Sequence, residues 1–165
     1  MGSEDLFHKR KAKKASDLAR QKAKRKSYLR VLIVCEGEKT EPHYFNELKA
    51  FYELSTADVE VEGKCGSSPI SVFKKAKKLF LKEKHSGNPF DKVFCVFDKD
   101  THTTYNETIE GICNYKPKEV FRHVTSVPCF EFWLLLHFTP TTKPFVSNGK
   151  KSAADCVIHD LKKYI

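Results

Sequence analysis

Apolar residues along the chain follow two patterns, which predict an alternation of strands and helices. Continuous runs of branched and aromatic residues at 29–35 and 92–97 are typical of buried central strands. Segments 59–62 and 119–126 predict two further strands. Apolar residues three or four positions apart predict helices at 41–54, after Ser68, and at 103–115, 130–138 and 153–164.

The order of these elements predicts an α/β fold with a doubly wound, mostly parallel sheet and helices on both of its faces. One domain over 29–165 is expected, because a chain of 165 residues with 40% hydrophobic residues can build one core. Thr40 or Glu38 is the predicted cap of the first helix. Helix 130–138 is apolar all round, which predicts burial on most sides.

Charge is distributed very unevenly along the chain. Most of the net charge of +9 lies in the first 30 residues. Residues 1–28 contain few large apolar side chains, which predicts a basic, flexible arm that is disordered or transiently helical. Such an arm attracts a polyanion by counterion release, so DNA or RNA is the expected partner, and a merely solvated tail is the alternative. Its basic residues are Lys9, Arg10, Lys11, Lys13, Lys14, Arg20, Lys22, Lys24, Arg25 and Lys26.

The cysteines and the hydropathy limit the location of the protein. None of the 6 cysteines forms a Cys-x-x-Cys pair, which argues against a structural zinc site. Cys35 and Cys95 lie inside the apolar runs and are expected to be buried thiols. Without a signal peptide or an apolar run of about 20 residues, the sequence predicts a cytoplasmic protein that does not enter a membrane.

Acidic residues follow the two most apolar strands. Glu36 comes directly after 29–35, and Asp98 and Asp100 come directly after 92–97. Ligands of open parallel sheets bind outside the carboxyl ends of the strands, so the three carboxylates converge if these strands are neighbours. Converging carboxylates repel one another, and a hard divalent ion such as Mg²⁺ is the usual compensation. All three residues are therefore candidate metal ligands.

Three motifs carry a resemblance to known families. VCEG at 34–37 and FDKD at 97–100, each after an apolar strand, resemble the TOPRIM domain of topoisomerases, primases and OLD-type nucleases. Together, CEGEKTEP at 35–42, VFDKD at 96–100 and PCFEFWLLLHF at 128–138 resemble the RloB-like family. The resemblance runs in the right order from about Arg30 to Phe138.

The resemblance implies a TOPRIM-like fold and Mg²⁺- or Mn²⁺-dependent phosphodiester hydrolysis on nucleic acid. It assigns the general acid or base to Glu36 and the Mg²⁺ pair to Asp98 and Asp100. It also implies a role in bacterial restriction or anti-phage defence, with a partner protein from the same locus. Members of the family usually continue beyond the last predicted helix, so a chain shortened at its C-terminus is expected.

Several neighbouring residues are candidates for a supporting role. Glu38 is ranked above Glu41, because Glu41 already favours the helix N-terminus through its position. Lys39 and Lys99 either hold a phosphate or balance charge, and Glu131 either faces the site or begins its helix. His137 is interpreted as a structural histidine, whereas His102 is either a further ligand or proton shuttle or an exposed histidine in a turn.

Two other functions compete with hydrolysis. A non-catalytic nucleic-acid-binding module would use the basic arm and keep the acidic cluster as a relic or a structural clip. A nucleotide binder would use the same edge of the sheet, but the sequence lacks both Gly-x-Gly-x-x-Gly and a Walker-type loop. The common dinucleotide and triphosphate sites are therefore disfavoured.

Overall fold

The computed structural model describes residues 29–54, 59–99 and 102–165. The predicted basic arm and the candidate ligand Asp100 lie outside these residues. Four parallel strands form one sheet in the order β2-β1-β3-β4. The strands are β1 (Val31–Cys35), β2 (Val59–Glu62), β3 (Lys92–Asp98) and β4 (Phe121–Ser126).

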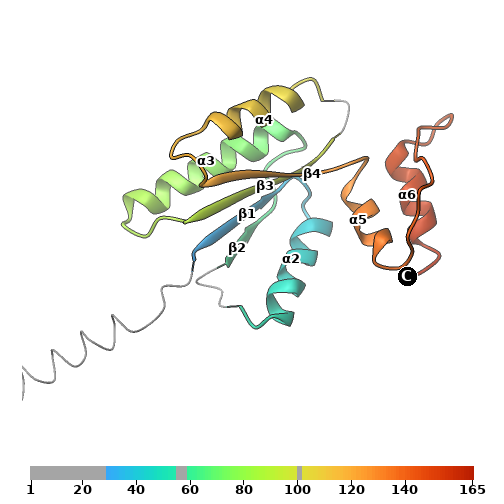
Figure 1. Cartoon of the computed structure of the whole chain (residues 1–165), viewed down its shortest axis with the longest axis horizontal. Coiled ribbons are helices and arrows are strands. Elements are labelled where there is room, and N and C mark those ends of the chain that lie inside the picture. Colours follow the sequence, from blue (N-terminus) through green and yellow to red (C-terminus); the bar gives the residue numbers. More distant parts are fainter. Residues whose placement is uncertain (1–28, 55–58, 100–101) are drawn as a thin grey trace, which may run out of the picture.

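Helices cover both faces of this sheet (Figure 1). On one face lie α3 (Pro69–His85) and α4 (Tyr105–Asn114), and on the other lie α2 (Thr40–Phe51) and α5 (Phe130–Leu136). The last helix, α6 (Ala153–Leu161), packs on α5 at the side of the molecule. The predicted doubly wound α/β fold is confirmed, and the sheet is parallel throughout.

The alternation of side chains along the strands divides the core between the two faces. Leu32 and Val34 of β1 pack with α3, whereas Cys35 packs with Phe130 of α5 on the opposite face. Cys95 is fully buried on the α3 side, so the predicted burial of Cys35 and Cys95 is confirmed. Because β1 and β3 are central strands, their carboxyl ends are held firmly at one edge of the sheet.

The cap predicted for α2 is wrong. Lys39 is the capping residue, Thr40 already lies inside the helix, and no side chain caps the helix end. Instead, the carboxylate of Glu41 turns back and accepts a hydrogen bond from the N–H of Gly37 at 3.1 Å. Ser68 does precede α3 as predicted, but its hydroxyl bonds the hydroxyl of Ser71 at 2.7 Å rather than a backbone N–H.

The predicted burial of helix 130–138 on most sides is also wrong. The helix ends at Leu136, and Trp133 and Leu136 are 46% and 40% exposed. The reason is that α6 covers one side of α5 while α2 and β4 contact another, which leaves an apolar groove between them. The groove has a volume of about 480 Å³, and its lining includes Tyr44, Leu48, Val124, Val127, Trp133 and Leu136.

Within the described ranges, no helix combines the length and the apolar character that a membrane crossing requires.

Candidate active site at the carboxyl ends of the central strands

The two central strands bring the predicted carboxylates together. Glu36 directly follows β1 and Asp98 is the last residue of β3, and the two strands are hydrogen-bonded neighbours. The N–H of Glu36 donates to the carbonyl of Val96 at 2.9 Å, which extends the ladder past the end of β1. In return, the N–H of Asp98 donates to Oε2 of Glu36 at 3.2 Å. The predicted convergence of Glu36 and Asp98 is confirmed.

Glu41 is a third carboxylate of this edge, and it is almost completely buried, with 6% of its surface exposed. Its Oε1 accepts the N–H of Gly37, the residue that follows Glu36. A Cβ atom at Gly37 would lie 2.0 Å from Oε2 of Glu41, which is far inside van der Waals contact. Glycine at position 37 is therefore what allows the Glu41 carboxylate to approach the backbone so closely.

A cleft of about 350 Å³ opens over these groups. Glu131 lines this cleft from the first turn of α5, so it both begins its helix and faces the site. Glu38 and Lys39 also line the cleft, but both are exposed at its rim. The complete lining is Glu36, Gly37, Glu38, Lys39, Thr40, Glu41, Asp98 and Glu131. The cleft is thus strongly acidic, with Lys39 as its one cationic side chain among the described residues.

The crowding of carboxylates changes the titration of Asp98. Burial raises the pKa of Asp98 to about 7, and repulsion from Glu41, Glu131 and Glu36 adds to the increase. A hydrogen bond from the backbone N–H of Phe130 acts in the opposite direction and lowers the pKa. Ionising Asp98 near neutral pH therefore costs free energy that a nearby cation would offset.

The donor set fits a hard divalent cation only in part within the described residues. Carboxylate oxygens are what Mg²⁺ prefers, and Mg²⁺ is commonly held by one or two carboxylates with waters and phosphates completing its shell. Glu36 and Asp98 supply such a pair. In the described part of the chain, no three His, Cys, Asp or Glu side chains are grouped closely enough to hold an ion. The third predicted ligand, Asp100, lies outside that part.

The remaining predicted residues of the described ranges do not line the cleft. Lys99 is exposed, and its Nζ lies 5.9 Å from the ring centroid of Tyr105. His137 lies outside the cleft lining, with its ring stacked on Tyr44 at 6.1 Å and edge-on to Trp133 at 4.8 Å. The carbonyl of His102 accepts the N–H of Tyr105 at 3.2 Å. Neither histidine lines the acidic cleft.

Glu41 is the residue that the sequence interpretation ranked too low. Its buried carboxylate contributes more than any other charge to the raised pKa of Asp98, whereas Glu38 is exposed at the rim of the cleft. The available signal was the spacing of Gly37 and Glu41. A side chain in the first turn of a helix lies over the residues that precede the helix, and glycine leaves room for it.

The thiols around the cleft are poor nucleophiles. Burial raises the pKa of Cys65 to about 11 and that of Cys129 to about 12. The thiol of Cys65 donates to the carbonyl of Cys35 at 2.8 Å. Because the thiolate is the reactive form, both side chains are essentially inert near neutral pH.

Comparison with known proteins identifies the family of the chain. No curated protein and no solved structure gives a significant match. A family model described as RloB-like protein matches residues 31–165, which covers the sheet, both helical layers and α6. The chain therefore belongs to the RloB-like family.

Proposed function

We propose that this protein is a metal-dependent nuclease that hydrolyses phosphodiester bonds at the Glu36–Asp98 edge of its sheet. One observation carries the proposal: Asp98 donates its backbone N–H to the Glu36 carboxylate while Glu41 and Glu131 face the same cleft. A cleft this acidic repels a phosphate unless a cation is present. A divalent ion held by Glu36 and Asp98 would remove this repulsion and attract a phosphate group.

The chain's own residues then have separate roles. Asp98 and Glu36, with Asp100 as the predicted third ligand, would hold Mg²⁺ or Mn²⁺. The bound ion would neutralise phosphate oxygens and acidify a water molecule. Glu36 moves the proton of the attacking water. Glu41, tied to Gly37, keeps the loop after β1 in place and so positions Glu36.

Hydrolysis by water is favoured over a covalent intermediate on the protein. Among the described residues that line the cleft, none is a serine, cysteine or tyrosine. The nearby thiol of Cys129 stays protonated, because burial and Glu131 both raise its pKa. The lining residue Thr40 carries a hydroxyl but has no histidine beside it in the cleft to act as its base.

Two broader assignments rest on the family resemblance of the motifs. A TOPRIM-type site is supported by the placement of Glu36 and Gly37 directly after β1 and of Asp98 as the last residue of β3. A role in anti-phage defence, with a partner protein of a restriction locus, follows from the same resemblance. We propose both as the biological setting of the nuclease.

The test is cleavage of labelled DNA and RNA, single- and double-stranded, with Mg²⁺, Mn²⁺ or a chelator. The full chain should cleave only with a divalent ion, and Glu36→Gln should reduce the rate at least about a hundredfold. The matched control is Glu47→Gln, an exposed glutamate of α2 outside the cleft, with a rate within about twofold of wild type. Equal rates in the two variants would contradict the role of Glu36.

The alternative of a non-catalytic module is favoured by one feature, the basic arm. It predicts binding without cleavage under every metal condition, and binding that survives Glu36→Gln unchanged. Cleavage by the wild type that disappears with chelator excludes it.

Deletion of residues 1–28 tests the arm itself. Ten lysines and arginines leave with it, so we expect weaker nucleic-acid binding and a flatter dependence of log K on log salt. Each lost phosphate contact should reduce the slope by about 0.7 to 0.9. Fluorescence anisotropy at several salt concentrations measures the affinity and its salt dependence. An unchanged slope would contradict a role of residues 1–28 in binding nucleic acid.

A further inference from the structure

A second cleft adjoins the acidic one and shares Asp98 with it. Its volume of about 510 Å³ lies within the range of roughly 300–1,000 Å³ that is usual for small-ligand sites. Three segments form its walls: the end of β3, the turn between β4 and α5, and the segment that leads into α6. Its lining includes Asp98, Lys99, Val127, Pro128, Ser147 and Ala153.

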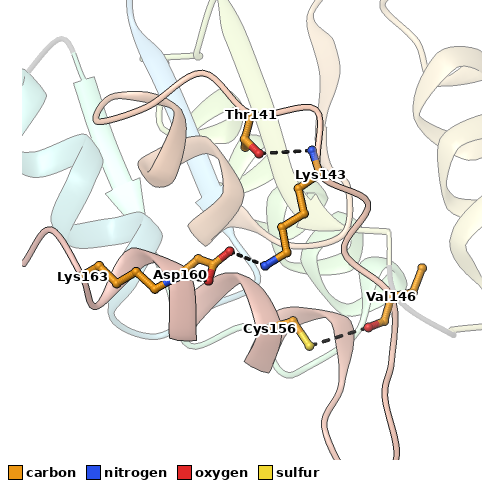
Figure 2. A network of polar contacts seen from close by, with 6 residues as sticks. All are labelled: Thr141, Lys143, Val146, Cys156, Asp160 and Lys163. Carbon is orange, nitrogen blue, oxygen red and sulfur yellow. Dashed lines mark hydrogen bonds and ion pairs between the residues drawn. The ribbon is translucent and has the colours of Figure 1, made fainter.

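The third wall is held in place by contacts within the C-terminal part (Figure 2). Lys143 forms an ion pair with Asp160 of α6 at 2.6 Å, and the Cys156 thiol donates to the carbonyl of Val146 at 3.6 Å. Leu135 of α5 and Val157 of α6 share a buried cluster beneath this segment. Val146, the residue before Ser147, is therefore held by α6. This contact fixes the segment from which Ser147 lines the same cleft as Asp98 and Lys99.

The start of α6 is fixed as well. Ser152 and Asp155 form a reciprocal capping box, with the Ser152 N–H donating to Asp155 at 2.8 Å and the Asp155 N–H donating to the Ser152 hydroxyl at 3.1 Å. Asn148 and Lys151 exchange backbone hydrogen bonds of 3.0 and 3.1 Å, which close a tight turn. Gly149 in this turn has φ +62°, a conformation that glycine adopts readily.

The two clefts differ in charge. The first is lined by carboxylates and by Lys39 at its rim. The lining of the second contains one lysine, Lys99, and one carboxylate, Asp98. The exposed Lys150 and Lys151 lie in the turn between its lining residues Ser147 and Ser152. A polyanionic strand can enter the first cleft only where a cation holds one phosphate. The rest of the strand leaves most easily over the less acidic of the two clefts, which is the second, with Lys99 in its lining and two exposed lysines in the adjoining turn.

The second cleft also has the chemistry of a nucleoside site. Val127, Pro128 and Ala153 form an apolar floor for a base or sugar, and the Ser147 hydroxyl can bond a polar edge. We propose that it binds the nucleoside adjacent to the scissile phosphate, with Lys99 contacting the next phosphate. Because a base must leave its helix to enter, the substrate is unpaired, single-stranded nucleic acid. This inference rests on the proposed nuclease function.

Binding without cleavage tests the second cleft directly. We would measure the affinity of the full chain for a labelled eight-nucleotide strand, DNA or RNA, and for the matching duplex, with Ca²⁺ in place of Mg²⁺ and with moderate salt to weaken binding by the arm. Ser147→Trp fills the cleft from an exposed position, and Lys99→Glu reverses its charge. Each should weaken single-strand binding about tenfold while leaving duplex binding within about twofold. Comparison of the DNA strand with the RNA strand shows which sugar the cleft accepts.

The matched control is Lys78→Glu, the same charge reversal on an exposed lysine of α3. It should have less than a twofold effect, and only Lys99→Glu should reduce the single-strand salt slope by about 0.7. Equal effects of Lys78→Glu and Lys99→Glu, or unchanged binding in Ser147→Trp, would overturn the proposal. If wild type cleaves while both cleft variants bind and cleave normally, the nuclease stands and the nucleoside site falls. If wild type never cleaves but Ser147→Trp still weakens single-strand binding, the nucleoside site stands and the proposed nuclease function falls.

Discussion

Asp98→Asn should abolish metal-dependent cleavage, with a loss of at least about a hundredfold. The amide keeps an oxygen that can accept the Phe130 N–H, and its volume matches the carboxyl group. It removes the negative charge that would hold the cation between β3 and Glu36. The measurement is the cleavage rate with Mg²⁺ on the substrate that wild type cuts fastest.

The same substitution should stabilise the metal-free fold. The pKa of Asp98 is raised to about 7, mainly by burial and by Glu41, so the folded state prefers the protonated form. The favourable contribution of that protonated group is complete below pH about 4 and is lost as the pH rises through 7. The amide of Asp98→Asn does not titrate. The free energy of unfolding of the variant should therefore exceed that of wild type by about 2 kcal/mol at pH 8, because solvent screens part of the effect, and by almost nothing near pH 4.

Asp98→Asn is expected to lower the cleavage rate and to raise stability, so the two effects separate loss of the metal site from unfolding. A variant that loses activity because it unfolds would lose stability as well, whereas Asp98→Asn should melt at a higher temperature in chelator at pH 8. Added Mg²⁺ should raise the melting temperature of wild type and leave the variant unchanged. Retained cleavage in the variant, or a lower melting temperature at pH 8, would remove Asp98 from the proposed site. Glu47→Gln again serves as the control for a lost exposed charge.

Local pattern was enough to predict the sheet. Segment 59–62 coincides with β2, and the apolar runs that predicted β1 and β3 end within a residue of the strands. β1 and β3 are predictable because a central parallel strand is covered on both faces and is therefore largely apolar, whereas the edge strand β2 shows the alternation of apolar and polar residues. The convergence of Glu36 and Asp98 followed from a rule about strand ends and from one unknown, whether β1 and β3 are neighbours. The structure shows that β1 and β3 are adjacent strands.

The parts of the site that the sequence did not reveal depend on packing between distant segments. Trp133 was expected in a buried helix, but α6 covers only one side of α5. A local sequence pattern does not predict how much of a helix its neighbours will cover. The second cleft is similar, because Ser147 comes beside Lys99 only through the contacts of α6 with α5. Glu41 was misjudged for a simpler reason. Its position at the start of a helix accounts for an acidic residue there, whereas its close approach to Gly37 depends on how the loop after β1 folds.

That close approach gives the second prediction of large effect, Gly37→Ala. The new methyl group would lie 2.0 Å from Oε2 and 2.7 Å from Cδ of Glu41, so the carboxylate must leave its place and lose the bond to the residue-37 N–H. We expect a loss of about 1–2 kcal/mol in unfolding free energy, because a buried carboxylate loses its partner. We also expect at least a tenfold lower cleavage rate, because the loop that carries Glu36 shifts with it.

A double-mutant cycle separates the clash from any other effect of the alanine. Glu41→Ala should lower the cleavage rate by a similar factor on its own, since it removes the same support for Glu36. The double variant Gly37→Ala with Glu41→Ala contains no carboxylate to displace, so its losses should be no larger than those of Glu41→Ala alone. Strict additivity of the two single changes, in stability and in rate, would mean that Gly37 and Glu41 act independently. The contact between a glycine and a buried carboxylate would then be incidental, and Glu36 would owe its position to the β1–β3 ladder and its contact with the N–H of Asp98.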